Sequence, residues 1–441
     1  MFERYFGLAA HGTTVRREVV AGFTTFLTMA YICMVNPSIL ANGGMDSEAV
    51  FVATCLAAGL TTILMGFWAK LPVALAPGMG LNAFLAFTVI PALNYDWKLA
   101  LGCVFLSGLL FVLVSVTPAR EWLINALPRS LKLAIAAGIG FFLALIGLAA
   151  AGIVRSNGSM SLLTAGSLAD APQLLAALGF VIIFALAARK VIGAVMIGIL
   201  LITIAGFALG QQPAPIGIAS LPPSLAPTFF QLHFDASDVT EGAIISTVLV
   251  FLLVVMLDTS GTLTAVAYQG KLLTEDGKLP NARRALTTDA VGSMLGAVLG
   301  TSPVTAYIES SAGIQAGGRS GLTAVVVGVL FLLALFFSPI AAAVPPFATA
   351  PALIFVAVLM VGGLKEIAWD DLTEAAPALL TALAIPFTYS IASGIGIGFI
   401  SYVAIKAVTW RWRDLNAAVV VIALAFVGKI ILDAQTFAGP H

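Results

Sequence analysis

Two acidic residues stand inside long apolar runs of this sequence, where an ionised side chain is costly. Asp258 lies in the segment VVMLDTSGTLTAV and Glu309 in the segment VTAYIES. A carboxylate near the centre of a membrane span costs roughly 2.5–3.5 kcal/mol, so acids at that depth usually bind a ligand or carry protons. The pair predicts a proton-linked binding site, and a purely structural carboxylate is the alternative for each. Asp289, near the start of an apolar run, is interpreted as a cap of the helix that begins after Thr287.

The segments that would position these acids include two interrupted apolar runs. The first, LPVALAPGMGLNAFLAF, carries Pro77, Gly78 and Gly80, and the second, GTSPVTAYIESSAGIQAGG, carries Pro303 and Gly313. Proline removes a backbone donor and glycine weakens a helix, so each run predicts a short extended piece that leads into a half-helix. Two half-helix N-termini that face each other near the middle of a membrane form a polar binding site. A pair of merely kinked helices is the alternative.

Further candidate contacts cluster around the interrupted runs. Asn82 follows Gly80 by two residues, and its amide could bond a ligand or tie the two runs together. Tyr307 and Phe84 could stack on a flat ligand, although most aromatic side chains in such a chain pack in the core or face lipid. A threonine in a span more often bonds its own helix than lines a cavity. The remaining candidates are the backbone N–H groups of Met79, Gly80 and Tyr307–Glu309 and the first-span side chains of Thr24, Thr25, Thr28 and Met29.

The composition places all these residues in a membrane. Of the 441 residues, 60% are apolar and 10% are charged, whereas a soluble domain has roughly 25% charged residues. Lipid can solvate the outside of so apolar a bundle. The net charge is zero, which gives no sign of a nucleic-acid partner.

The residue sets of several other protein classes are missing from the sequence. Its three cysteines, Cys33, Cys55 and Cys103, form no CxxC pair, so neither a disulfide framework nor a metal site is predicted, and no cofactor is expected. There is no Ser/His/Asp set and no phosphate-binding glycine loop followed by Lys-Ser/Thr. An enzyme and an ATP-driven pump are therefore disfavoured, and a carrier driven by an ion gradient remains.

Apolar runs close to the roughly 20 residues that cross a bilayer recur along the chain. They form two groups of seven, separated by the polar stretch Gln211–Glu241 and followed by one more apolar stretch, Leu415–Leu432. Because seven is odd, the second group enters the membrane from the opposite side, which predicts an inverted repeat. The runs are Val19–Leu40, Ala49–Trp68, Leu71–Leu93, Leu99–Thr117, Arg129–Ala150, Pro172–Ala188 and Val191–Leu209, then Gly242–Tyr268, Ala285–Gly300, Ser302–Gln315, Gly321–Val344, Thr349–Gly363, Pro377–Ser390 and Ile391–Thr409.

Charge placement supports fourteen spans with the N-terminus in the cytoplasm. That topology puts eighteen of the 21 lysines and arginines in cytoplasmic segments, with Lys98 and Arg155 outside and Lys429 in the last apolar stretch. Such an excess on one side is typical of the cytoplasmic face. The first run is interpreted as a retained helix rather than a removed signal peptide. The last stretch predicts either a fifteenth span or an interfacial helix.

Several motifs together resemble one family of carriers. The sequence is similar to AzgA-like adenine/guanine/hypoxanthine permeases of the nucleobase–cation symporter-2 superfamily from about His11 to Leu415. The wording of the second interrupted run and of WRWRDLN near the end leans towards the adenine type. The motifs that carry the resemblance are HGTTVRREVVAGFTTFLTMAYICMVNPSIL, LPVALAPGMGLNAFLAF, MLDTSGTLTAVA, TSPVTAYIESSAGIQAGGRSGLTAVVVG and PFTYSIASGIGIGF.

This resemblance implies an all-α polytopic membrane fold like that of the bacterial uracil permease. Fourteen spans would form seven-plus-seven inverted repeats, with spans three and ten broken by short antiparallel strands. A core domain would comprise residues 1–118 (spans 1–4) and 242–344 (spans 8–11). A gate domain would comprise residues 119–241 (spans 5–7 and the external loop) and 345–441 (spans 12–14 and the C-terminal segment).

The resemblance also implies a function. Asp258 and Glu309 match the family's substrate-binding carboxylates, Asn82 matches an asparagine of the family on span three, and the family uses proton symport. We expect Glu309 to be the preferred proton-linked group and Asp258 the second. We expect adenine as the favoured substrate, with hypoxanthine and guanine as alternatives, and an elevator-type movement. The expected setting is a bacterial inner membrane, with a homodimer through the gate domain. The rival interpretations are an anion carrier of the sulfate or bicarbonate type on the same fold and a membrane protein that transports nothing.

Overall fold

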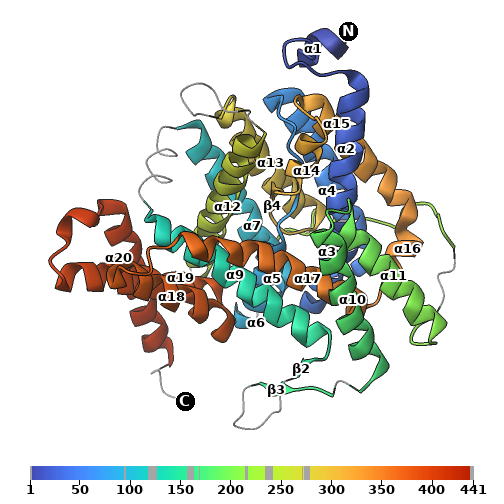
Figure 1. Ribbon diagram of the computed structural model, residues 1–441. Helices are drawn as coiled ribbons and strands as arrows, with labels where there is room; N and C mark the ends of the chain where they lie inside the picture. Colours follow the sequence, from blue (N-terminus) through green and yellow to red (C-terminus); the bar gives the residue numbers. More distant parts are fainter. Residues whose placement is uncertain are drawn as a thin grey trace.

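The structure is a computed structural model, and it describes residues 2–93, 96–117, 127–155, 163–167, 169–213, 217–233, 242–270, 272 and 279–437. Nearly all the described elements are helices (Figure 1). Several residues used for the topology prediction lie outside these ranges, namely Arg120, Lys271, Lys278 and parts of Gln211–Glu241.

The elements follow the chain in two series on either side of the segment 217–233. The first series is α1 (Phe2–Phe6), α2 (Val15–Met29), α3 (Ile32–Leu40), η1 (Ala41–Gly43), α4 (Ser47–Leu64), η2 (Met65–Ala69), β1 (Leu75–Pro77), α5 (Met79–Phe84), η3 (Leu85–Val89), α6 (Ile90–Leu93), α7 (Trp97–Val116), α9 (Arg129–Ala150), β2 (Val154–Arg155), β3 (Thr164–Ala165), α10 (Ala171–Ala188) and α11 (Ala194–Ala208).

The second series is α12 (Gly242–Gln269), α13 (Ala282–Leu299), β4 (Val304–Ala306), α14 (Ser310–Gln315), α15 (Gly321–Ala334), η5 (Leu335–Phe337), α16 (Ser338–Ala342), α17 (Pro346–Val361), η6 (Gly362–Glu366), α18 (Leu372–Phe387), α19 (Ile391–Val408), η7 (Trp412–Asp414) and α20 (Ala417–Phe437).

The described helices have the length and composition expected of a multi-pass membrane protein. Nine are long and apolar enough to cross a membrane, and four shorter apolar helices accompany them. The bounds of α9 are those of the predicted run, whereas α13 begins at Ala282, three residues before the predicted run. The predicted start was late because Arg283 and Arg284 are charged, yet both belong to the first turn of this helix.

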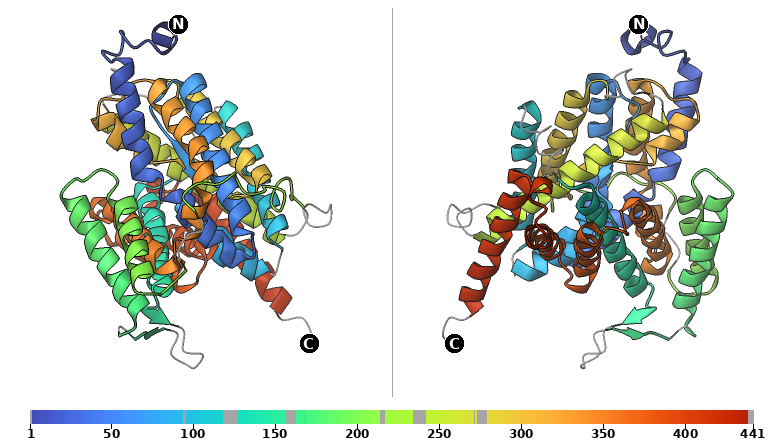
Figure 2. Two further views of the ribbon diagram at one scale, coloured as in Figure 1. Left: turned by 90° about the vertical axis from the view of Figure 1, so that its right-hand side faces the viewer. Right: turned by 60° about the vertical axis from the view of Figure 1, so that its left-hand side comes forward.

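The helices pack in two groups. In the first, α15 packs on α2 and α4, and α13 packs on α4 and α7; in the second, α9 packs on α17 and α18, α18 on α19, and α10 on α11 and α17. Contacts between the groups include α5 with α9, α12 with α19 and α11 with α2. Figure 2 shows α10 and α11, in green, at the edge of the molecule.

Glycines let the helices of the first group cross at close range. A Cβ atom on Gly66 would stand 2.4 Å from the carbonyl oxygen of Gly321, and one on Gly321 would stand 2.0 Å from the carbonyl oxygen of Gly66. The pair Gly59 and Gly328 repeats this arrangement further along, with 2.6 Å from a Cβ on Gly328 to the Gly59 carbonyl oxygen. Small residues at such crossings allow close van der Waals contact, which stabilises helix pairs in lipid.

Glu18 fastens the start of α15 to α2. The side chain is fully buried, and its carboxylate accepts hydrogen bonds from the backbone N–H groups of Arg319, Ser320 and Thr323 at 2.9–3.3 Å. The hydroxyls of Ser320 and Thr323 donate to it at 2.8 and 2.6 Å. The N-terminus of α15 would otherwise expose unpaired donors, so this carboxylate acts as a cap supplied from another helix. This role of Glu18 could not be predicted from the sequence.

Charged residues join the ends of the second group. Lys406 of α19 is buried and forms ion pairs with Glu374 of α18 at 2.7 Å and Asp414 of η7 at 2.9 Å. Tyr402 donates to Glu374 at 3.2 Å, and Ser130 of α9 donates to the same carboxylate. Breaking a buried ion pair leaves an uncompensated charge, so these contacts hold α9, α18, α19 and η7 in one arrangement.

A neighbouring exposed pair lies at the same end. Arg411 binds Asp371, the N-cap of α18, at 2.6 Å. Hydrogen bonds from Thr373 and Arg411 lower the pKa of Asp371 to about 2, so this carboxylate stays ionised at more acidic pH than an ordinary aspartate does.

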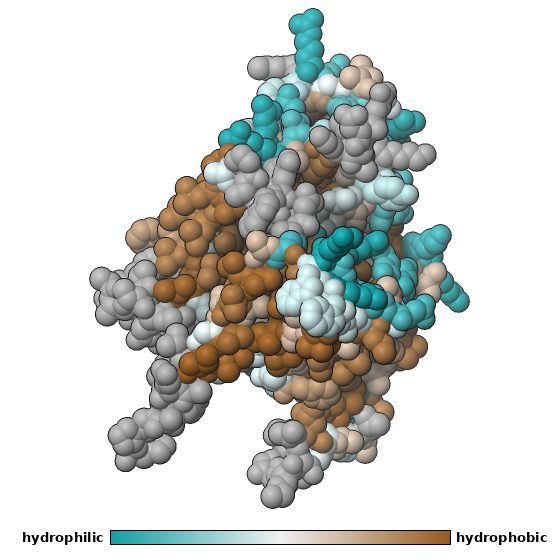
Figure 3. Space-filling view, turned by 90° about the vertical axis from the view of Figure 1, so that its left-hand side faces the viewer, coloured by the Kyte–Doolittle hydropathy of each residue, from teal (hydrophilic) through white to brown (hydrophobic). Residues whose placement is uncertain are grey.

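The surface carries many large apolar side chains. Leu113, Val181, Ile204 and Leu372 are more than half exposed. Figure 3 shows a broad apolar area on one face, with hydrophilic residues towards the end that carries the N-terminus and in a cluster beside the apolar area. An apolar surface of this extent is solvated by lipid. Helix α20 packs mainly on α19 and lies at the edge of the molecule (Figure 1).

We predict that Glu18→Gln lowers the stability of the protein by about 2 kcal/mol, because a neutral amide cannot accept the same set of charge-assisted hydrogen bonds. Thermal unfolding in detergent measures the effect. Glu3→Gln, at an exposed position of α1, is the matched control. Equal melting temperatures for the two variants would show that the cap contributes nothing.

Candidate functional site

Both interrupted runs contain a short strand, and the two strands pair with each other. β1 runs antiparallel to β4, with Leu75 opposite Ala306 and Pro77 opposite Val304. The pairing continues beyond the strands, because the Gly78 N–H donates to the Pro303 carbonyl at 2.9 Å and the Tyr307 N–H to the Ala74 carbonyl at 3.0 Å. Extended backbone is tolerated at membrane depth only where its polar groups are satisfied inside the protein.

A short helix follows each strand. α5 begins at Met79 and α14 at Ser310, so each starts within a few residues of the paired strands. The first N–H groups of a helix have no partner within it. One expected donor is already used: the Tyr307 N–H bonds Ala74, so the prediction that it faces a ligand was wrong. It failed because the strand ladder extends one residue further than the sequence could indicate.

The two acids singled out by the sequence lie at this strand pair. Asp258 of α12 lies beside the side chain of Thr305 in β4. Glu309 is the residue just before α14, and the hydroxyl of Tyr31 donates to its Oε1 at 2.9 Å. Both acids are partly exposed, and their carboxylates are close enough to interact electrostatically. The structure thus brings together two acids that are 51 positions apart in the chain.

Asp289 does not cap a helix, contrary to the sequence interpretation. It lies inside α13 and is fully buried, with Oδ2 accepting a hydrogen bond from the Thr259 hydroxyl at 2.7 Å. It also interacts electrostatically with Asp258. The interpretation failed because it placed the helix start near Thr287, whereas α13 begins at Ala282.

Asn82 ties the two interrupted runs together. It is fully buried in α5, and its Oδ1 accepts a hydrogen bond from the hydroxyl of Ser302, next to β4. Its Nδ2 lies 4.0 Å from the sulfur of Met79. The tying role is therefore present, and the amide nitrogen keeps donor capacity for another partner.

The two candidate aromatic residues are both buried. Tyr307 donates its hydroxyl to the carbonyl of Pro77 at 2.5 Å, which adds a further bond between the interrupted runs. Phe84 packs edge-to-face on Phe251 of α12, with ring centroids 4.9 Å apart. Each ring is thus fixed by protein contacts beside the strand pair.

The first-span candidates separate into different roles. Thr24 and Thr28 bond carbonyls of their own helix, those of Val20 and Thr25, at 2.8 and 2.7 Å. The Thr25 hydroxyl is buried and has no hydrogen-bond partner among the described residues. It faces α14, because a Cβ atom on Gly313 would stand only 2.1 Å from its oxygen. Met29 is fully buried in the main apolar cluster.

Tyr31 is the site residue that sequence reasoning missed. It is buried between α2 and α3, and it is the side chain that donates to Glu309. A signal was present, since a tyrosine inside an apolar run needs a partner for its hydroxyl. Gly80, one of the candidates, instead approaches the second helix group: a Cβ atom there would stand 2.3 Å from the Cγ2 of Ile139 on α9.

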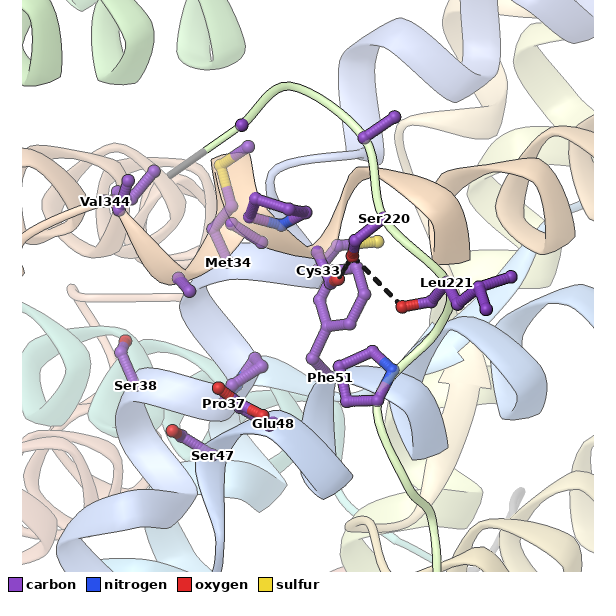
Figure 4. Close-up of a pocket in the computed structure, with 18 of the residues that line it drawn as sticks. Cys33, Met34, Pro37, Ser38, Ser47, Glu48, Phe51, Ser220, Leu221 and Val344 are labelled. Carbon is purple, nitrogen blue, oxygen red and sulfur yellow. Dashed lines mark hydrogen bonds between the residues drawn. The ribbon is translucent and has the colours of Figure 1, made fainter. Parts of the chain in front are cut away.

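A separate cavity of about 770 Å³ opens beside α3 and α4 (Figure 4). Its wall includes Cys33, Met34 and Phe51 as well as Ser220 and Leu221 of the segment 217–233. The lining does not include Asp258 or Glu309. Cys33 is, however, only two residues from Tyr31.

An apolar helical body whose two broken crossings pair at one polar site is the architecture of a secondary transporter. Residues 16–397 match the Permease family, and the chain belongs to that family. The relatives are permeases rather than enzymes, which agrees with the sequence prediction.

Curated relatives cover nearly the whole chain. Adenine permease AdeP of Escherichia coli is 47% identical, over 99% of this chain and 97% of its own length. Guanine/hypoxanthine permease PbuG of Bacillus subtilis is 48% identical, over 89% of this chain and 90% of its own length. These matches confirm the resemblance drawn from the motifs.

The fold is shared with a more distant solved structure. The transmembrane domain of the cyanobacterial bicarbonate transporter BicA superposes with a TM-score of 0.67, at 16% identity, over 84% of this chain and 96% of that domain. At this identity the likeness concerns the fold alone.

We predict that Ser302→Ala destabilises the protein by roughly 1–3 kcal/mol, because it leaves the buried Oδ1 of Asn82 without its donor. Thermal unfolding in detergent tests this. Ser107→Ala is the control, since the Ser107 hydroxyl is equally buried but bonds only the Val104 carbonyl of its own helix at 2.7 Å. If both variants unfold at the same temperature, the hydrogen bond between Ser302 and Asn82 contributes nothing to stability beyond that of the control.

Proposed function

We propose that this chain imports purine nucleobases by proton symport. The observation that carries the proposal is that Asp258 and Glu309 lie near each other at the paired broken crossings. The chain is also 47% identical to an adenine permease and 48% identical to a guanine/hypoxanthine permease. Adenine is the favoured substrate, with hypoxanthine and guanine as alternatives.

A purine suits this site because each polar edge of the ring needs a partner once water is excluded. Glu309, held by Tyr31, bonds one edge of the ring, and Asp258 bonds a second edge or positions Glu309. The N–H groups of Met79 and Gly80 and the Nδ2 of Asn82 supply donors. Tyr307, Phe84, Thr25 and Met29 shape the walls around the base.

Protons couple to transport through the same acids. Glu309 is the preferred proton-linked group and Asp258 the second, because both are partly exposed carboxylates beside the substrate position. One proton moving inward gains roughly 2.3 kcal/mol per 100 mV of membrane potential. That energy supports about a fifty-fold gradient of a neutral substrate.

The proposed architecture is a set of fourteen spans in seven-plus-seven inverted repeats, with spans three and ten interrupted. Antiparallel pairing of β1 with β4 supports it, because inverted copies of one segment run in opposite directions where they meet. The helix pairs α10–α11 and α18–α19 stand at corresponding places in the two halves. Two segments that the topology places on the cytoplasmic side are also in contact, because Arg129 and Glu366 form an ion pair.

The packing of the helices in two groups supports a division into two domains. Residues 1–118 and 242–344 would form the core domain, and residues 119–241 and 345–441 the gate domain. An elevator-type movement of the core against the gate would expose the site alternately to each side, and a homodimer would form through the gate. The setting is a bacterial inner membrane with the N-terminus in the cytoplasm, as the lysine and arginine placement favours.

An anion carrier is the second candidate, because the fold is shared with a bicarbonate transporter. A carrier for sulfate or bicarbonate would be expected to place a fixed cation near the half-helices. Neither 71–93 nor 302–315 contains a lysine or an arginine. The purine proposal is favoured for that reason.

Purified protein in proteoliposomes should accumulate radiolabelled adenine when an inward proton gradient is imposed. Unlabelled hypoxanthine and guanine should compete more strongly than uracil, because the site is matched to a purine. A protonophore should abolish the accumulation. Saturable uptake of sulfate or bicarbonate without uptake of any purine would instead establish the anion carrier.

Glu309→Gln should abolish accumulation of the labelled purine while leaving the amount of protein in the membrane unchanged. The amide keeps the size of the side chain but cannot take up and release a proton. Glu366→Gln, which removes an exposed carboxylate paired with Arg129, should transport normally. Full uptake by Glu309→Gln would remove Glu309 from the proton pathway.

A further inference from the structure

We propose that Cys33 and Cys55 form a dithiol site for trivalent arsenicals, and that occupation of this site inhibits transport. The two cysteines come from adjacent helices, α3 and α4, and both are free thiols. Their sulfur atoms lie 3.5 Å apart. The inhibitory part of the proposal rests on the transport function proposed above, whereas the binding part does not.

The sulfur spacing suits a single bridging atom without further approach of the two helices. A disulfide bond is about 2.05 Å long, so the sulfurs would have to approach by roughly 1.5 Å. Arsenic(III) is pyramidal, and with bonds to sulfur of about 2.3 Å, as zinc has, its bond angle of roughly 95° holds two sulfurs roughly 3.4 Å apart. The observed spacing of 3.5 Å is close to that value. The pair is therefore already placed for one atom to join both sulfurs.

The cavity beside α3 and α4 gives access to Cys33, the first sulfur that an arsenical would meet. Cys33 forms part of its wall, whereas Cys55 lies fully buried behind it. Figure 4 shows Cys33, Met34 and Phe51 around this space, with Ser220 of the segment 217–233 beside Cys33. A volume of about 770 Å³ admits an aryl group attached to the bridging atom. Cys103, on α7, does not line the cavity.

The reaction needs no oxidant. Hydrated phenylarsine oxide carries two hydroxyl groups on As(III). Each thiol proton leaves with one of these hydroxyls as water, so two As–O bonds break, two As–S bonds form and arsenic keeps its oxidation state. The product is a ring that joins α3 to α4 through one arsenic atom.

Bridging acts on the transport site through two short connections. Cys33 follows Tyr31 by two residues on the same span, and Tyr31 holds Glu309. Cys55 follows Thr54 in α4. The Nδ2 of Asn36 donates hydrogen bonds to the hydroxyls of both Thr54 and Thr301, at 2.7 and 2.8 Å. Thr301 directly precedes Ser302, the partner of Asn82. A covalent link between the sulfurs therefore restrains both walls of the site.

The binding test uses the purified full-length protein, phenylarsine oxide and mass spectrometry. We expect one phenylarsenic unit per chain, located by peptide mapping on Cys33 together with Cys55. The adduct should survive excess monothiol and be removed by 2,3-dimercaptopropanol, because only a dithiol competes with a chelate. Cys103→Ala should bind as the wild type does, and Cys33→Ala and Cys55→Ala should lose the chelated adduct.

The transport test repeats the titration on proteoliposomes. The arsenical concentration that halves uptake should rise on the order of 100-fold in Cys33→Ala and Cys55→Ala, because the second sulfur acts at a high effective concentration. If Cys55→Ala does not fold, Cys55→Ser takes its place. Peptide mapping of the adduct on the wild-type protein tests the dithiol site without any variant.

Two results would overturn the proposal. An adduct on Cys103, or none on the folded wild type, would remove the dithiol site. A complete adduct on Cys33 and Cys55 with unchanged uptake would remove the inhibition. If the wild type transports no purine, the function proposal fails, and peptide mapping still decides whether the dithiol site exists.

Discussion

Everything in this structure depends on satisfying backbone polar groups where no water is available. Two crossings contain extended rather than helical backbone, and each alone would place unpaired N–H and C=O groups in the apolar interior. The antiparallel pairing of β1 with β4, extended by Gly78 and Tyr307, gives these groups partners. Because the partners come from opposite halves of the chain, the polar site exists only when both halves are in place.

The side chains around the strands reinforce this arrangement. Asn82 and Ser302 join the interrupted runs, and the Tyr307 hydroxyl bonds the carbonyl of Pro77. Hydrogen bonds that are fully satisfied in a low-dielectric interior hold their partners in one geometry. The hydroxyl of Tyr31 holds Glu309, and Asp258 lies beside Thr305 of β4. A ligand would therefore meet groups that are already positioned, which limits the cost of ordering them.

Much of this site could be predicted from the sequence, for identifiable reasons. Proline and glycine in two apolar runs indicate broken crossings, and acids such as Asp258 and Glu309 are too costly in a span to go unnoticed. Tyr31 escaped attention because a single tyrosine in an apolar run looks like a core residue. Asp289 was misplaced because arginines in the first turn hid the true start of α13.

Other features lay beyond a reading of one sequence. Glu18 looks like an ordinary acid in the first turn of α2, and only the three-dimensional arrangement shows that it caps α15. The use of the Tyr307 N–H by Ala74 depends on the register of two strands that lie far apart in the chain. The 3.5 Å approach of Cys33 to Cys55 likewise results from how α3 packs on α4.

The distance along the chain between the two strands has a consequence for biosynthesis. β1 ends at Pro77 and its partner does not begin until Val304. At 5–20 residues per second, ribosomes need roughly 10–50 s to make the intervening chain. Throughout that interval the first broken crossing lacks its strand partner. The nascent segment must wait at the translocon or in a watery interface, or be shielded by a chaperone, before it can settle at its final depth.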